Sequence, residues 1–215
     1  MTQGYDVHVI PKEATYRPTP ARITELVKFL SLRLEIAGDF SVDGEDELST
    51  ENAIEHLRAA AQSNSGGSEC TVSFNDLVSG SLFGYDQDAS DPDENFWADE
   101  VRIYLTAIPF PWCDWEYEDA TCPACGQRFS QIKDLLEEVR LTGSPVTCPC
   151  GARTLPEDLK KSPGVNLAQL AIVFGGNKGW HYEVSQDRDL FKDSDFLASL
   201  EQILATPLEV VVIGC

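Results

Sequence analysis

The segment Val101-Arg-Ile-Tyr-Leu-Thr-Ala-Ile108 predicts a β-strand in this 215-residue chain. It is rich in β-branched and aromatic residues, which favour a strand. Pro109 and Pro111 follow it directly, and we expect the strand to end there because proline cannot donate to a strand ladder. We place this strand in the sheet of an α+β fold in which helices pack on the sheet.

Other strands are predicted to join it in a mixed β-sheet. Tyr5–Pro11 alternates in polarity and stops at proline, and Val210–Ile213 is a short apolar run that is typical of a buried strand. Leu167–Phe174 and Trp180–Val184 flank the turn segment Gly175-Gly-Asn-Lys-Gly179, which predicts a β-hairpin.

Three helices are predicted to cover this sheet. The first begins at Thr19-Pro20, where threonine is the N-cap and proline takes the first helical position. The second is capped by Ser49 or Thr50, and the third by Ser194. Cys70–Phe74, between the second helix and the Val101 strand, is a further strand candidate.

Two closely spaced cysteine pairs carry the strongest chemical signal, Cys122-Pro-Ala-Cys125-Gly126 and Cys148-Pro-Cys150-Gly151. Proline after the first cysteine fixes a turn, and the glycine that follows can adopt a positive φ. Four thiolates at this spacing suit tetrahedral Zn²⁺ with Zn–S bonds of about 2.3 Å. We expect a structural site, because four thiolates leave no position for water or substrate.

The segments 122–126 and 148–151 together resemble a zinc ribbon built from two knuckles. The resemblance covers residues 111–161, which we interpret as a module inserted into a core domain of residues 1–110 and 162–215. The second knuckle is one residue shorter than usual, so Cys113 is an alternative ligand. One alternative is that the four cysteines bind iron, as in rubredoxin. Another is that the cysteines are reduced and bind no metal.

The chain is very acidic, with 36 Asp and Glu against 16 Lys and Arg and a net charge of −20. This charge disfavours binding to nucleic-acid phosphates and to anionic membranes. The longest apolar runs, such as Leu208–Cys215, are too short to span a bilayer. Residues 1–10 contain no basic region followed by an apolar stretch. We therefore expect a soluble cytoplasmic protein whose cysteines are reduced.

The acidic excess is concentrated in residues 86–119, which hold eleven acids, one base and three of the four tryptophans. We interpret this stretch as a docking surface for a basic protein, because aromatic rings supply contact area and carboxylates steer a cationic partner. The alternative is that the rings belong to the core or pack beneath the cysteine module. The residues predicted to contact the partner are Trp97, Asp114, Trp115, Glu116 and Tyr117.

The sequence shows no complete catalytic motif. His8, His56 and His181 lack the spacing of metal ligands, and His56 lies on a polar helix face. Cys70 or Cys113 paired with His181 would be the nucleophile of a Cys–His enzyme, although nothing in the sequence supports that pairing.

We therefore expect a non-enzymatic interaction protein, similar in composition to inhibitor or immunity proteins, with a structural zinc site and a basic protein partner. The first alternative is an enzyme with a pocket in the α+β core, lined by His8 or His181, and with the cysteine module as a brace. The second alternative is a nucleic-acid-associated regulator. Its phosphate contacts would be Arg128, Arg140, Arg153 and Lys160.

Overall fold

The computed structural model describes residues 5–34, 40–42, 45–62, 70–75, 98–113, 120–129, 135, 138, 145–155, 158, 165–176 and 194–214. Its main sheet contains β1 (Tyr5–Pro11), β2 (Phe40–Val42), β3 (Glu45–Leu48), β4 (Cys70–Asn75), β5 (Ala98–Cys113), β10 (Val165–Gly176) and β11 (Leu208–Gly214). Its helices are α1 (Pro20–Arg33), α2 (Thr50–Gln62) and α4 (Ser194–Leu204).

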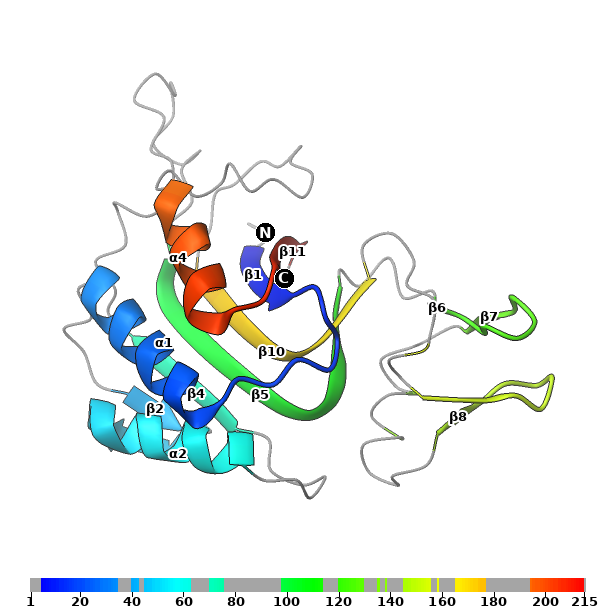
Figure 1. Cartoon of the computed structure of the whole chain (residues 1–215), viewed down its shortest axis with the longest axis horizontal. Coiled ribbons are helices and arrows are strands. Elements are labelled where there is room, and N and C mark those ends of the chain that lie inside the picture. The colour runs from blue at the N-terminus through cyan, green and yellow to red at the C-terminus, as the bar shows by residue number, and fades with distance from the viewer. Residues whose placement is uncertain are drawn as a thin grey trace.

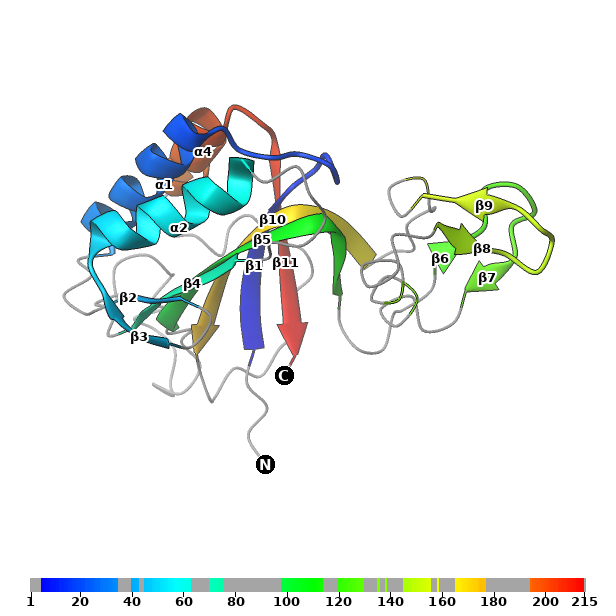
Figure 2. The same ribbon diagram turned by 90° about the horizontal axis from the view of Figure 1, so that it is seen from below.

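The seven strands lie in the order β11-β1-β10-β5-β4-β2-β3. The three helices cover one face of this sheet (Figures 1 and 2). The expected α+β class is confirmed. None of the described helices has both the length and the apolar character needed to cross a membrane.

The prediction of a mixed sheet is wrong for the described strands, since every pairing among them is antiparallel. β10 and β11, with α4 between them in the chain, run parallel to each other. They are not neighbours in the sheet, because β1 lies between them and pairs antiparallel with both. β5 occupies the other side of β10. The expected hairpin strand Trp180–Val184 lies outside the described residues.

A single large core fills the space between the sheet and the helices. On β1, Val7 and Val9 point into this core, whereas His8 lies on the opposite face because side chains alternate along a strand. Three aromatic rings join the layers. Phe174 of β10 meets Phe196 of α4 edge-on at 6.0 Å between ring centroids, and Phe196 stacks on Phe29 of α1 at 5.5 Å.

The predicted helix starts are confirmed for the first two helices. The Arg22 backbone N–H donates to Thr19 Oγ1 (3.4 Å), and Pro20 takes the first helical position of α1. For α2, Ser49 is the cap, since the Asn52 backbone N–H donates to its Oγ (3.3 Å). These side chains satisfy backbone donors that have no partner inside the helix.

β5 does not end at Pro109 as predicted, but continues to Cys113. Leu105 pairs with Leu170 and Phe110 pairs with Ala168, so four residues of β5 bulge opposite one residue of β10. The bulge contains Pro109 and therefore removes the need for a ladder N–H at that position. Beyond it, the ends of β5 and β10 form a two-stranded arm that leads towards the cysteine module (Figure 2).

Candidate metal centre

Each cysteine pair lies in the turn of a small hairpin (Figures 1 and 2). The first hairpin pairs β6 (Ala120–Thr121) with β7 (Arg128–Phe129), and the second pairs β8 (Val146–Thr147) with β9 (Arg153–Thr154). Both contain the order Thr-Cys-Pro, then Cys-Gly, one further residue and Arg. The two hairpins therefore present equivalent turns.

The first turn is closed by backbone hydrogen bonds around Cys122. Its N–H donates to the Gln127 carbonyl (2.8 Å), and its carbonyl accepts from the Gly126 N–H (2.8 Å). Gly126 has φ of 74°, in the left-handed region that glycine adopts without steric penalty. The turn thus aims both cysteine side chains to one side.

The second turn closes in the same way although it is one residue shorter. The Cys148 N–H donates to the Ala152 carbonyl (2.9 Å), and the Cys148 carbonyl accepts from the Gly151 N–H (2.8 Å). Gly151 has φ of 88°. The shorter spacing is therefore compatible with a closed knuckle turn.

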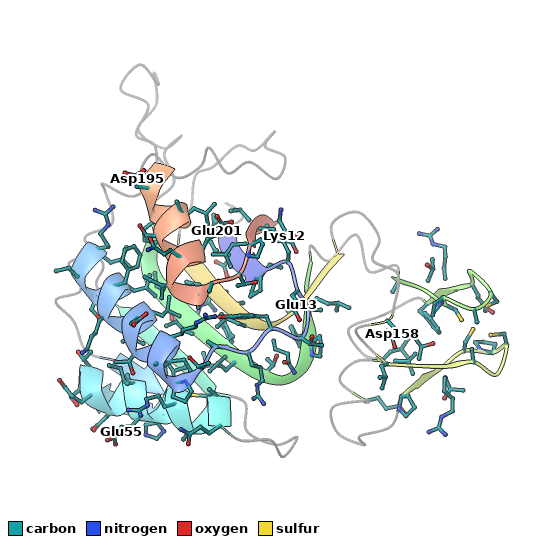
Figure 3. The ribbon with its side chains drawn as sticks, in the orientation of Figure 1. Lys12, Glu13, Glu55, Asp158, Asp195 and Glu201 are labelled. Atoms are coloured by element: carbon teal, nitrogen blue, oxygen red, sulfur yellow. The ribbon has the colours of Figure 1, made fainter. Side chains whose placement is uncertain are left out.

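The four thiol groups meet between the hairpins, where Figure 3 shows the sulfur atoms of the module gathered together. All four Sγ atoms of Cys122, Cys125, Cys148 and Cys150 lie within 4.8 Å of one another. Cys122 Sγ is 3.9 Å from Cys150 Sγ, and Cys125 Sγ is 3.7 Å from Cys148 Sγ. A tetrahedral ion with metal–sulfur bonds of about 2.3 Å requires sulfur separations of about 3.8 Å. The four cysteines can therefore hold one metal ion.

Among the described residues, the two hairpins share one small apolar cluster with β10. Ala120, Phe129 and Val146 are buried together with Cys122 and Cys148, and Leu167 of β10 belongs to the same cluster. The second cysteine of each pair is exposed. This cluster of described residues buries little apolar surface, so it is by itself a weak source of folding free energy.

The electrostatic environment of the thiols favours a bound cation. Burial raises the pKa of the Cys122 thiol, but hydrogen bonds from the backbone of Cys125 and Ala124 and from the thiols of Cys148 and Cys125 together lower it to about 7. For Cys148, the N–H of Cys150 lowers the pKa, but burial and the neighbouring thiols raise it to about 12. Crowded thiols oppose each other's ionisation, and a divalent cation removes that opposition.

The residues predicted to contact a partner, Trp97, Asp114, Trp115, Glu116 and Tyr117, all lie outside the described residues. Two other aromatic residues of the same stretch are described. Tyr104 and Phe110 are partly buried and pack against an apolar cluster on the face of the sheet opposite the helices. At least these two rings therefore contribute to packing. The side chain of Cys113, the alternative ligand, is also outside the described part of the chain.

The structure brings together a polar group that the sequence analysis missed. Arg102 Nη2 lies 2.6 Å from Asp6 Oδ2, and Arg102 Nη1 donates to the Tyr104 hydroxyl at 3.0 Å. The guanidinium crosses β10 over Gly175, where a Cβ would lie 2.8 Å from Nη2. The register of β1, β10 and β5 places these residues together. The sequence offered one signal, because Arg102 is the single base in an acidic stretch and is therefore expected to have acidic partners.

The histidines and arginines of the alternative functions are partly described. His8 is buried beside this polar group, and burial followed by the positive charge of Arg102 lowers its pKa to about 3. His56 is exposed on α2, and Cys70 is buried in the core on the helix side. In the module Arg128 and Arg153 are exposed, whereas His181, Arg140 and Lys160 lie outside the described residues.

This chain matches no protein-family model, no curated protein and no solved structure.

Proposed function

We propose that Cys122, Cys125, Cys148 and Cys150 bind one zinc ion as a structural centre, and that the chain is a non-enzymatic, acidic protein that binds a basic protein partner. The zinc assignment is carried by the convergence of four thiols at sulfur separations of 3.7 and 3.9 Å. The partner assignment is carried by the net charge of −20.

A structural role follows from the ligand set. Four thiolates complete a tetrahedron, so water or a substrate has no open position on the ion. The apolar cluster formed by the described residues of the hairpins is small. We therefore expect folding of the module to depend on the metal, whose binding free energy in such modules is on the order of 10 kcal/mol. The filled d-shell of Zn²⁺ imposes no preferred coordination geometry. The ion can therefore be bound in one tetrahedral site by two knuckles of different length.

Removal of the metal tests this role. In native hydrogen exchange of the full chain, a strong chelator is expected to abolish protection at Cys122, Gly126, Cys148 and Gly151, whose N–H groups are bonded within the turns. Amides of β1 and β10 are expected to keep their protection. Unchanged protection of the turns after the metal has left would contradict a structural role.

The charges around Arg102 support a basic partner. Arg102 is the single base among residues 86–119, and it is engaged by Asp6 at 2.6 Å and by Glu100 at 3.4 Å. Its charge is thus balanced by Asp6 and by Glu100, which is one of the eleven acids, so the stretch keeps a large acidic excess. A long-range attraction for cationic proteins is the physical consequence.

A pull-down at two salt concentrations tests the partner. Capture of a basic protein is expected to fall several-fold when the salt rises from about 0.05 to 0.5 M, because the charges are screened. The double variant Asp114→Asn/Glu116→Gln should weaken capture at low salt. Glu51→Gln/Glu55→Gln removes the same charge from exposed positions of α2, where Figure 3 labels Glu55, and should leave capture unchanged. Capture that is indifferent to salt, or equal losses in both variants, would count against this surface.

A further inference from the structure

The two edges of the main sheet differ in how well they resist the addition of another strand. Among the described strands, β3 and β11 are the outermost in the sheet order. β3 has four residues, three of which are acidic, and the register between β2 and β3 is irregular. Short length, charge and irregular pairing all discourage a further strand from joining an edge. The β3 edge is therefore protected.

β11 lacks this protection. Its seven residues contain no lysine or proline, and residues 210–213 are all β-branched. Its register with β1 is unbroken from Leu208 to Gly214. No described strand pairs with the side of β11 that faces away from β1. A regular apolar edge strand of this kind is a template for pairing with another strand.

The pairing with β1 shows which backbone groups of β11 face outwards. Leu208 lies opposite Pro11, which has no N–H, and the Leu208 N–H donates to Glu201 Oε1 of α4 at 3.0 Å. Leu208 therefore turns its backbone away from β1. Inward and outward residues alternate along an antiparallel pair. Val210 and Val212 thus also direct their N–H and C=O groups to the outer edge, and the residues between them bond to β1.

The accessible part of this edge lies away from the start of β11. β5 comes close to β11 without pairing with it. The bulge of β5 lies opposite Gln169 of β10, and the Gln169 N–H donates to the Ala14 carbonyl (3.0 Å), beyond the end of β1. This level corresponds to the start of β11, because Pro11 pairs with Leu208. We therefore expect an added strand to pair from Val210 onwards.

Charge indicates which kind of strand this edge would accept. A second copy of the chain would bring another net charge of −20 to the contact, which opposes self-pairing. The charged residues near the start of β11 include Glu13, Glu201, Glu209 and Lys12 (Figure 3). Carboxylates outnumber the ammonium group there, as they do in the whole chain. Both charges favour a cationic segment.

We propose that an extended, basic segment of the protein partner pairs with β11 as a further antiparallel strand. This inference rests on the proposed basic partner, and it adds a second contact surface and the form in which the partner binds. Backbone hydrogen bonds supply affinity in such pairing, and alternate side chains supply specificity. Val210 lies in the main core on the helix side, so Glu209 lies towards the opposite side. A fitting segment therefore alternates apolar residues with lysine or arginine.

Amide hydrogen exchange of the full unbound chain tests the edge first. The N–H groups of Val210 and Val212 are expected to exchange roughly ten times faster than those of Val211 and Ile213, which donate to β1. If Val210 and Val212 are already protected, another segment covers the edge and the proposal is overturned.

A synthetic peptide of about seven residues, with alternating valine and lysine and both ends blocked, is the probe. At saturation it should slow exchange at Val210 and Val212 roughly tenfold. Opposite residues of an antiparallel pair share a face and can exchange both hydrogen bonds, so the peptide valines should direct their N–H groups at β11. N-methylation of the valines should abolish the protection. N-methylation of the lysines keeps the same charge and should preserve it, and equal protection by the two forms would contradict strand pairing.

Val212→Pro is the matched change in the protein. Proline removes an N–H that β1 does not use, so the chain should still fold but lose the peptide-dependent protection of Val210. Val212→Ala keeps the N–H and should still bind the peptide. Unchanged protection in folded Val212→Pro would overturn the proposal. If the proline variant does not fold, the two N-methylated peptides decide with the unmodified chain.

Three further outcomes separate this inference from the function on which it rests. Equal protection by a peptide with glutamine in place of lysine would overturn the preference for a basic segment. A dimer of the unmodified chain in sedimentation that Val212→Pro abolishes would assign the edge to a second copy. Salt-dependent capture of a basic protein that is unchanged in Val212→Pro overturns strand pairing alone, whereas a chain that captures no basic protein overturns the proposed partner as well.

Discussion

Arg102 on β5 reaches across β10 to Asp6 on β1, where its Nη2 atom lies 2.6 Å from the carboxylate Oδ2. The side chains of Arg102 and Asp6 are 26% and 18% exposed, so solvent partly screens the pair. Gly175 of β10 makes the crossing feasible, because a Cβ at that position would lie 2.8 Å from the guanidinium. The glycine and the ion pair are therefore coupled.

A double-mutant cycle measures this coupling. Asp6→Asn is expected to lower the free energy of unfolding by about 1 kcal/mol, since the pair is partly screened. In a Gly175→Ala background the methyl group displaces Arg102, and the effect of Asp6→Asn should shrink towards zero. Gly175→Ala alone should change stability little, because alanine is better than glycine in a strand and offsets the lost pair. Urea unfolding of the four proteins gives the coupling, and equal effects of Asp6→Asn in both backgrounds would refute it.

His8 makes stability depend on pH. Burial, and then the charge of Arg102, lowers its pKa from 6.5 to about 3 in the folded protein. Between these two pH values the unfolded chain therefore binds more protons on His8 than the folded chain does. The contribution of neutral His8 to the free energy of unfolding is thus fully present above pH 6.5 and is lost as the pH falls towards 3. From pH 7 to pH 5 the loss should be on the order of 2 kcal/mol.

The variant His8→Gln isolates this contribution from that of the carboxylates. It is neutral at both pH values, so its free energy of unfolding should fall less than that of the unmodified chain on acidification. His56→Gln, on the exposed surface of α2, is the matched control and should retain the full loss. An equal fall in His8→Gln and the unmodified chain would show that His8 is not buried as a neutral ring.

The knuckle glycines should be needed for backbone conformation alone. Gly126 and Gly151 have φ of 74° and 88°, and in the described part of the chain no atom beyond their immediate chain neighbours lies within 4 Å of the position of a Cβ on either. Alanine there meets a left-handed backbone penalty of about 1–2 kcal/mol, which should weaken zinc binding by about 5- to 30-fold. Asparagine tolerates this conformation and should bind closer to the original affinity. Competition with a chelator of known affinity measures the difference, and equal affinities of the alanine and glycine forms would contradict the prediction.

Local signals in the sequence predicted the parts of the structure that depend on neighbouring residues. The N-cap Thr19 and the proline after it mark the start of α1. The spacing of the cysteine pairs predicts that the four thiols meet, because each Cys-Pro turn and its glycine form a closed knuckle independently of the rest of the chain.

Features that depend on strand order could not be read in this way. The prolines after Ile108 predicted a strand end, but pairing with β10 over a bulge carries β5 on to Cys113. The position of β1 between β10 and β11 makes the sheet antiparallel, and no local pattern encodes it. The contact between Arg102 and Asp6 likewise follows from the register of three strands.

X-ray absorption at the zinc edge of the full chain, combined with its metal content, tests the proposed zinc site itself. We predict one zinc per chain, surrounded by four sulfur atoms at about 2.3 Å. Cys148→Ser should replace one of these sulfur atoms with a lighter ligand. A chain without zinc, or an ion with a water or nitrogen ligand in the unmodified protein, would contradict it.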